Sequence, residues 1–269
     1  MRFSLNRVAA VVTKELAELR RNAAALIPVV ILAVVTVTLP FLIVIIVPDA
    51  VGEPLSRDSD FTKMAARGGR DLGALSAEGI VQAFLFQQFL LVQLLIPVTG
   101  AMAFAGHSLI GEKQARSLEP LLATPITTTE LLVAKGFGAL VPSLIIMLCA
   151  TTIYFLGIAL MAEAGVLGAL LNAGSALVLL GLGPAASLVA LQVGVLVSSR
   201  VNDPRTAQQF SAFLILPLTA LFAVQFTGAL SMTLSLVFLL VLALLAIWLL
   251  LVAVGVVLFD REAILTRWR

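Results

Sequence analysis

The stretch GEKQARSLEPLLATPITTTELLVAK (Gly111–Lys135) holds six charged residues and two prolines between two long apolar runs. Ser117 can cap a short helix, Pro120 is tolerated in its first turn, and the Thr-Pro pair at 124–125 ends it. Residues 121–123 give this helix an apolar side, and charged residues surround it. A short, rigid helix of this kind can fit a cleft in a soluble protein and pass on that protein's movement. The stretch therefore favours contact with a partner, in a coupling elbow over residues 111–130.

Patterns typical of catalysis or metal binding are missing from the sequence. The chain has one histidine, His107, and one cysteine, Cys149, and neither has the neighbours that would suggest a ligand set. No zinc-protease, serine-hydrolase or phosphate-loop motif occurs. His107 is interpreted as an interfacial polar residue rather than a switch, and Cys149 as a small packing residue. We expect no enzyme activity and no cofactor on this chain.

The composition places these residues in an integral membrane protein. The chain is 61% hydrophobic and 12% charged, with a mean hydropathy of +1.11, whereas soluble domains carry about 25% charged residues. About 20 apolar residues in a helix span a hydrocarbon core of roughly 30 Å, and these runs lack strand-like alternation. We predict an all-α protein whose permease domain, residues 23–269, has six transmembrane helices. The predicted spans are Ala23–Val47, Ile80–Ile110, Thr128–Met161, Leu170–Val197, Thr206–Thr227 and Thr233–Phe259.

Positive charges set the predicted orientation. Thirteen of the 17 lysines and arginines lie in or near the N-terminus, the second and fourth loops and the C-terminus, and such segments face the cytoplasm. Both termini are therefore predicted to be cytoplasmic. The outer loop 48–79, with mixed charges, is predicted to be a solvated connector, the alternative being an external gate or docking surface. Ser76 is predicted to cap the second span, and Thr127 with Glu130 the third.

Residues 1–22 are predicted to form an amphipathic helix. Apolar residues recur every three or four positions between Leu5 and Leu19, and charged residues gather on the other side. A basic amphipathic helix before a span commonly lies in the membrane interface, with its apolar stripe in the lipid. Two interpretations stay open: an anchor that sets orientation, or an interfacial brace that also touches a cytoplasmic partner.

Polar residues in the cores of the predicted spans are uncharged. The lack of Asp, Glu, Lys and Arg there disfavours a proton or metal path. The second span carries three amides, which either hydrogen-bond to neighbouring helices or line a translocation path. They point in different directions on a helix and form no single stripe. These possible path-lining residues are Gln87, Gln88 and Gln93.

A second cytoplasmic elbow is predicted over residues 198–206, within SSRVNDPRTAQQFSAFLILPL (Ser198–Leu218). An Asn-Asp pair can cap a helix that has Pro204 at its first position, where proline is preferred. The basic residues on either side then lie at the cytoplasmic interface. The candidate residues of this elbow are Arg200, Asp203 and Arg205.

The two elbows carry a resemblance to a known family. The run SLEPLLATPITTTELLVAK is similar to the coupling-helix segment of type-two ABC exporter permeases, which include sodium and drug efflux half-permeases. Ser198–Leu218 is similar to the stretch between spans four and five in that family, and both termini also fit. Arg116 stands where the family has glycine, and Gln114 where an acid is common. The resemblance implies that contact with an ATPase is made by Glu112, Ser117, Leu118, Glu119, Leu121, Leu122, Thr124 and Pro125.

The resemblance further implies one membrane subunit of an ATP-driven exporter in the plasma membrane of a prokaryote. Two copies of the chain would pair in the lipid as a homodimer around a central path. Two copies of a separate ABC ATPase subunit would dock below and bind ATP and Mg²⁺. No nucleic-acid partner is expected. The alternative is a gradient-driven secondary transporter or channel, which the missing intramembrane carboxylates and the missing inverted repeat disfavour.

Overall fold

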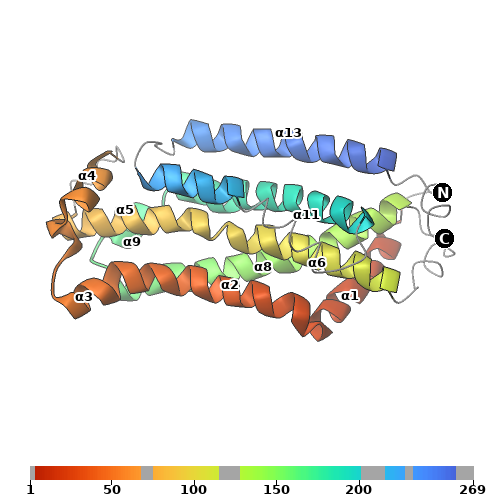
Figure 1. The fold of residues 1–269 in the computed structure, drawn as a ribbon, viewed down its shortest axis with the longest axis horizontal. Helices are drawn as coiled ribbons and strands as arrows, with labels where there is room; N and C mark the ends of the chain where they lie inside the picture. Colours follow the sequence, from red (N-terminus) through yellow and green to blue (C-terminus); the bar gives the residue numbers. More distant parts are fainter. Residues whose placement is uncertain (1–3, 68–74, 115–127, 201–215, 228–232, 259–269) are drawn as a thin grey trace.

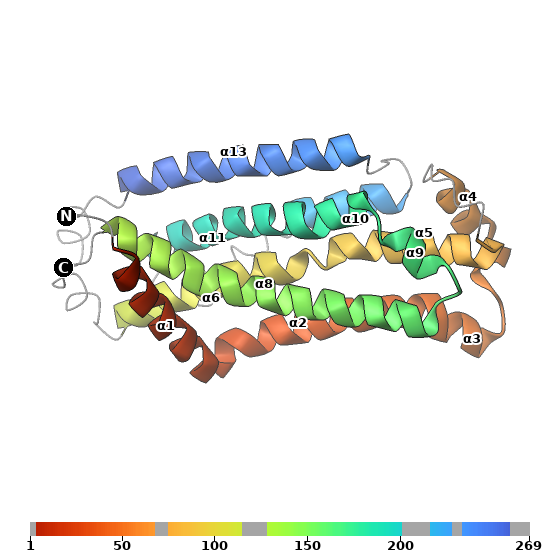
Figure 2. The ribbon, with the colours of Figure 1, turned by 180° about the vertical axis from the view of Figure 1, so that it is seen from behind.

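The computed structural model describes residues 4–67, 75–114, 128–200, 216–227 and 233–258. All regular elements in these ranges are helices, and the long ones lie side by side along one axis (Figure 1). One end of the bundle, the α1 end, holds α1 (Leu5–Arg21) and the last turns of α13 (Leu234–Leu258). The opposite end, the α4 end, holds α4 (Ser59–Arg67), as the reverse view also shows (Figure 2).

Five of the described helical segments are long and apolar enough to cross a membrane. This confirms an all-α membrane protein. The fifth predicted span, Thr206–Thr227, is described as a helix only over Leu216–Phe226, so the count of six spans stays a prediction. The five segments are built from α2 (Ala23–Phe41), a π-helical turn (Leu42–Ile46) and α3 (Val47–Val51); α5 (Ala77–Val92) and α6 (Leu95–Gln114); α8 (Thr128–Met161); α10 (Ala173–Leu177), a second π-helical turn (Val178–Leu182) and α11 (Gly183–Arg200); and α13.

Short polar side chains fix where several helices begin. Ser76 caps α5 as predicted, because its Oγ accepts a hydrogen bond of 2.8 Å from the Gly79 N–H. Asn172 caps α10 in the same way, accepting from the Ser175 N–H at 3.0 Å. The predicted start of the fourth span at Leu170 is therefore wrong, since Leu170 ends the separate short helix α9 (Val166–Leu170).

The second span is broken at Gln93 and Leu94, between α5 and α6. Pro97 accounts for the break, because proline has no N–H to donate to the Gln93 carbonyl four residues earlier and its ring crowds that carbonyl. The Gln93 carbonyl instead accepts from the Ile96 N–H at 3.1 Å, a tighter turn than an α-helix makes. The sequence indicated one uninterrupted helix here.

The described part of the outer loop packs against the bundle. It contains a 3-10 turn (Leu55–Arg57) and α4, and Phe61 of α4 packs against the main hydrophobic cluster. The Glu78 carboxylate at the start of α5 accepts hydrogen bonds from the N–H groups of Leu55 (3.2 Å) and Ser56 (2.8 Å). The segment is therefore more than a solvated connector.

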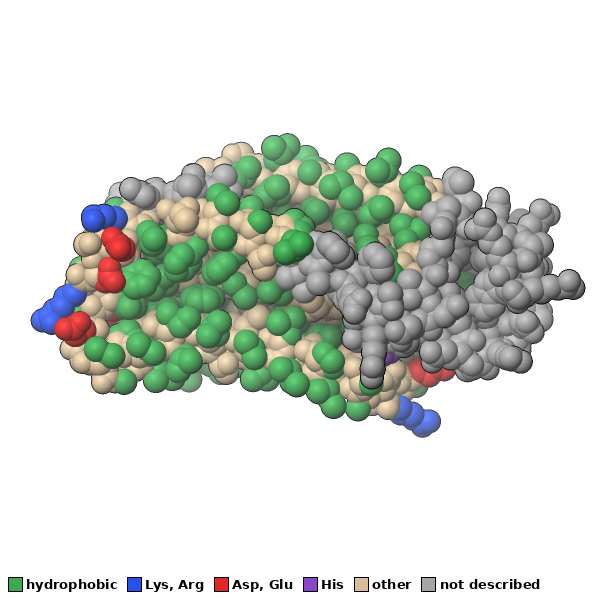
Figure 3. All heavy atoms as spheres, in the orientation of Figure 1, with side chains coloured by type: hydrophobic (Ala, Val, Ile, Leu, Met, Phe, Trp, Pro, Cys, Tyr) green, Lys and Arg blue, Asp and Glu red, His purple; other side chains and the backbone are tan. Residues whose placement is uncertain are grey.

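The helices pack around α6, which contacts α2, α8 and α11. Toward the α4 end, the rings of Phe41, Phe86 and Tyr154 form an aromatic cluster between α2, α5 and α8. α13 packs on α11, and only 6% of the residues in its most apolar 18-residue stretch are buried. Where side chains are coloured, the visible face is mainly hydrophobic, and charged side chains lie toward its two ends (Figure 3). Such an apolar belt between charged ends suits a helix bundle in lipid.

Candidate functional site

The described helices hold the two arms of the predicted coupling elbow. Glu112 lies in the last turn of α6, which reaches Gln114, and α8 begins at Thr128. In the second elbow, Arg200 is the last residue of α11. The other predicted contact residues lie outside the described residues: Ser117, Leu118, Glu119, Leu121, Leu122, Thr124, Pro125, Asp203 and Arg205.

A buried ion pair joins α1 to α8 close to these arms. The Lys135 Nζ atom of α8 lies 3.0 Å from the Glu15 Oε1 atom of α1, and their side chains are only 5% and 7% exposed. Lys135 also donates a hydrogen bond of 2.8 Å to the Ser108 Oγ atom of α6. We call Glu15, Ser108 and Lys135 the three-helix contact. It links α1 to both helices that flank the coupling elbow.

Gly138 allows α1 to approach α8 this closely. It lies three residues after Lys135, so the two share one face of α8. A Cβ atom placed on Gly138 would lie 2.7 Å from the Cβ of Glu15, closer than two carbon atoms can pack. Any larger residue would therefore push α1 outward and lengthen the contact between Glu15 and Lys135.

A second ion pair fixes the start of α1. The Glu130 Oε1 atom, in the first turn of α8, lies 3.0 Å from Arg7 Nη2 and accepts a hydrogen bond of 2.6 Å from the Ser4 N–H. Glu130 is fully buried, whereas the Arg7 side chain is 32% exposed. Glu130 was predicted to cap α8 together with Thr127, which lies outside the described residues. Its carboxylate also binds α1, a role that the local pattern did not indicate.

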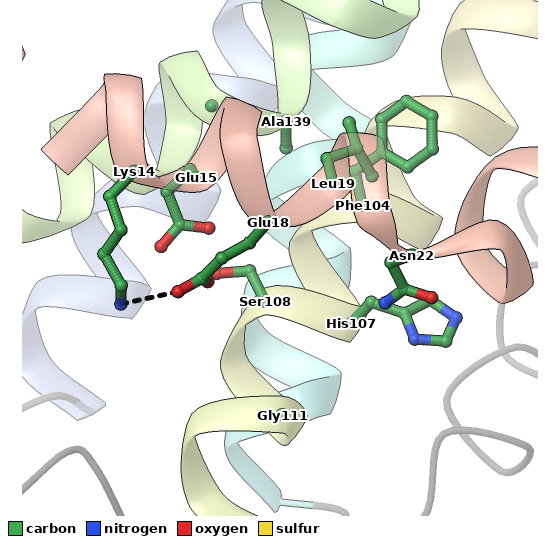
Figure 4. Close-up of a pocket in the computed structure, with 11 residues that line it drawn as sticks. Lys14, Glu15, Glu18, Leu19, Asn22, Phe104, His107, Ser108, Gly111 and Ala139 are labelled. Carbon is green, nitrogen blue, oxygen red and sulfur yellow. Dashed lines mark ion pairs between the residues drawn. The ribbon is translucent and has the colours of Figure 1, made fainter. Parts of the chain in front are cut away.

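A cavity of about 260 Å³ lies beside the three-helix contact. Residues of α1 and α6 face it, together with Gly138 and Ala139 of α8 (Figure 4). Lys14 and Glu18 form an ion pair of 3.4 Å within α1 at this site. His107 also lines the cavity, and its Nε2 atom is buried with no hydrogen-bond partner among the described residues. The α1–α6 boundary is therefore polar and loosely filled.

Sequence reasoning missed the three-helix contact because each charge was weighed alone. Glu15 falls in the stripe Val8, Val12, Glu15, Leu19 that α1 turns toward the protein, and Lys135 interrupts the apolar start of the third span. A single charge on an otherwise apolar face is costly unless it is paired. Two such charges of opposite sign, both predicted at the same membrane surface, were the available signal.

The three amides of the second span do not share one surface. Gln87 Oε1 accepts a hydrogen bond of 3.0 Å from Ser175 Oγ of α10. Gln93 is fully buried at the break, where its Oε1 accepts 2.7 Å from Thr151 Oγ1 of α8. Gln88 is also buried, and its Oε1 has no partner among the described residues. Two of the amides thus join neighbouring helices, and their lining of a path stays a prediction.

Replacing Thr151 with valine should lower the free energy of unfolding by about 1 kcal/mol, the usual scale of an interhelical hydrogen bond in a membrane protein. The change keeps the shape of the side chain but leaves the buried Gln93 Oε1 without this donor. Titration with sodium dodecyl sulphate in micelles would measure the loss. Thr152→Val is the matched control, because the exposed Thr152 hydroxyl bonds only within its own helix, to the Leu148 carbonyl. Equal losses in the two variants would contradict the assignment.

The described residues contain no group of three or more His, Cys, Asp or Glu that could hold a metal ion. Cys149 lies exposed on α8 rather than packed inside. The polar features described at the α1 end are ion pairs and hydrogen bonds within and between helices.

Comparison with known proteins assigns the chain to one family. The chain matches no curated protein. A family model described as ABC-2 family transporter protein matches residues 9–238, from the middle of α1 into α13. The match includes the five described span segments at least in part, and it includes both elbows. The chain belongs to the ABC-2 family of transporter proteins and is a membrane permease of an ABC transporter.

Proposed function

We propose that the chain forms, as a homodimer, the translocation path of an ATP-driven exporter in the plasma membrane of a prokaryote, with a separate ABC ATPase docking at the α1 end. Both termini and the α1 end then face the cytoplasm. ATP and Mg²⁺ bind to the ATPase, and this chain supplies no catalytic residue. The family match supports a partner ATPase in general; the dimer, the direction of transport and the docking site are our proposal.

One observation carries the docking site: two long helices, α6 and α8, end close to α1 on either side of the coupling elbow. Lys135 bonds to both α1 and α6 within about two turns of these ends. A partner that presses on the elbow would therefore press on helices that Lys135 joins to α1. ATP can drive the change only if it binds the pressed and relaxed states with different affinity.

Co-expression with an ABC ATPase from the same genome tests the proposal. A tagged chain in lipid nanodiscs should retain that ATPase through purification, and the complex should hydrolyse ATP. Hydrogen–deuterium exchange in α6 should differ between the ADP state and a vanadate-trapped state, because α6 forms one arm of the elbow. A chain that binds no ATPase and transports under an ion gradient alone would instead support a secondary transporter or channel.

Alanine at Glu119 or Leu122 should uncouple this complex. Because both residues are predicted to contact the ATPase, we expect the difference in α6 exchange between the two nucleotide states to fall at least about tenfold, a change on the scale of an interface hot spot, while ATP hydrolysis continues. The matched controls are Glu53→Ala and Leu171→Ala, which change exposed residues toward the α4 end. Wild-type coupling in both elbow variants would refute the assigned contact.

A further inference from the structure

The three-helix contact lies where movement of the elbow would enter the bundle. Ser108 is six residues before the end of α6 at Gln114, and Lys135 is seven residues after the start of α8 at Thr128. At 1.5 Å per residue, both positions lie about 10 Å along their helices from these two helix ends. The contact is thus outside the elbow but close enough to control how its two arms move.

A one-residue connection joins α1 to α2, the start of the first span. α1 ends at Arg21 and α2 begins at Ala23, so only Asn22 separates them. The Asn22 side chain accepts a hydrogen bond of 3.2 Å from the Ala25 N–H and caps α2. A shift of α1 would therefore be passed to α2 directly, since no loop is present to absorb it.

A buried ion pair is an unusual choice for this contact. Removing two charges from water is costly, and apolar residues of similar size often give equal or greater stability. What an ion pair adds is direction, because the carboxylate and the ammonium group must meet at one register of the two helices. Gly138 removes the side chain that would hold α1 away, and Ser108 adds a third partner on α6.

We propose that Lys135 is a positioning residue for coupling: it holds α1, the end of α6 and the start of α8 as one body, so that movement of the elbow reaches the first span through α1. This inference rests on the proposed function, since it assigns a route to force from the ATPase. It gives α1 a mechanical role in coupling.

Hydrogen–deuterium exchange on the full chain in nanodiscs tests the contact itself. Lys135→Met, which keeps length and removes charge, should speed exchange about tenfold or more both in α1 and in the last turns of α6, because it frees Glu15 and Ser108 together. Lys135→Arg should preserve most of the protection. Lys14→Met is the matched control, since it removes a neighbouring lysine whose ion pair is exposed. Faster exchange in α1 alone would overturn the three-way role.

The complex with the ATPase then tests the route. The Lys135→Met variant should still bind the ATPase, and the complex should still hydrolyse ATP. The difference in α2 exchange between the ADP and vanadate-trapped states should fall at least about tenfold. The charge-swapped double variant, Glu15→Lys with Lys135→Glu, should recover it, whereas each single reversal should not. Wild-type transmission in Lys135→Met, or no recovery in the swapped variant, would overturn the inference. Failure of the unaltered chain to bind any ATPase would instead refute the proposed function.

Discussion

Replacing Gly157 with alanine should destabilise the folded chain, although alanine favours a helix over glycine by about 1 kcal/mol. Gly157 lies in α8 where this helix crosses α2, and a Cβ atom there would lie 2.5 Å from Cζ of Phe41. The Phe41 ring has little room to move, because its centroid is 5.3 Å from that of Phe86 and 5.6 Å from that of Tyr154. One added methyl group must therefore separate α8 from α2.

We expect a net loss of about 1–3 kcal/mol in the free energy of unfolding for Gly157→Ala, the range found for overpacked cores. Gly157→Leu should prevent accumulation of the folded chain. Gly106→Ala is the matched control, since a Cβ at Gly106 meets nothing within 4 Å and the helix preference alone should act. The two alanine variants should thus shift the midpoint of a denaturant titration in opposite directions. A gain in stability for Gly157→Ala would show that α2 and α8 do not pack this closely.

The sequence predicted most span boundaries because a membrane makes them a local property. A helix must continue while its backbone lies in hydrocarbon, so the length of each apolar run nearly fixes its ends. The predicted third span, Thr128–Met161, has the same bounds as α8, and α13 (Leu234–Leu258) lies within one residue of its prediction. Ser76 was equally readable, since capping depends on residues within one turn.

Interruptions inside the spans were harder to predict. The π-helical turns at Leu42–Ile46 and Val178–Leu182 each end two residues before a proline, Pro48 and Pro184. Local π adjustment is one way in which a membrane helix absorbs the missing N–H of a proline. Pro97 was a visible signal for the break at Gln93, but a proline inside a membrane helix can also be absorbed without a break. α8 keeps Pro142 in an unbroken helix. Packing against neighbours decides between the two outcomes, and a single sequence does not contain that information.

The candidate site was predicted as a region rather than as a set of contacts. The elbow was predicted from its caps and charges, and it stays a prediction. The residues Glu15 and Lys135, which join α1 to α8, are 120 positions apart. Each charge can be buried only because the other pairs with it, so neither residue predicts the contact when it is considered by itself. The ion pair of Arg7 and Glu130 was missed for a similar reason. Glu130 was interpreted from its local capping pattern, which does not indicate a contact with α1.

Replacing Pro97 with alanine should stabilise the chain and impair coupling. The change restores an N–H that can bond to the Gln93 carbonyl, so α5 and α6 should join into one straighter helix. Because Pro97 is buried, the loss of its ring contacts offsets part of the roughly 3 kcal/mol that proline costs in a helix interior. We expect the free energy of unfolding to rise by about 1 kcal/mol.

The impairment follows from what holds each half of the second span. α5 is fixed near the α4 end, where Glu78 binds the outer loop and Gln87 accepts from Ser175. α6 is fixed to α1 and α8 through Ser108 and Lys135. With a break between them, α6 can tilt while α5 keeps its contacts. In a continuous helix α5 would have to move with α6 and give up its contacts, which raises the free-energy cost of the movement.

Pro97→Ala in the complex with the ATPase should therefore reduce nucleotide-dependent hydrogen exchange in α6 at least about tenfold, while the resting exchange of α5 and α6 also slows. Pro142→Ala is the matched control, because it removes a proline from a helix that is already continuous and should add stability without loss of coupling. If Pro97→Ala were more stable but fully coupled, the break would be a packing feature rather than a hinge. If it were less stable, the ring contacts of Pro97 would outweigh the restored hydrogen bond. Only greater stability together with weaker coupling fits a hinge between the half of the span that the ATPase moves and the half that the outer loop holds.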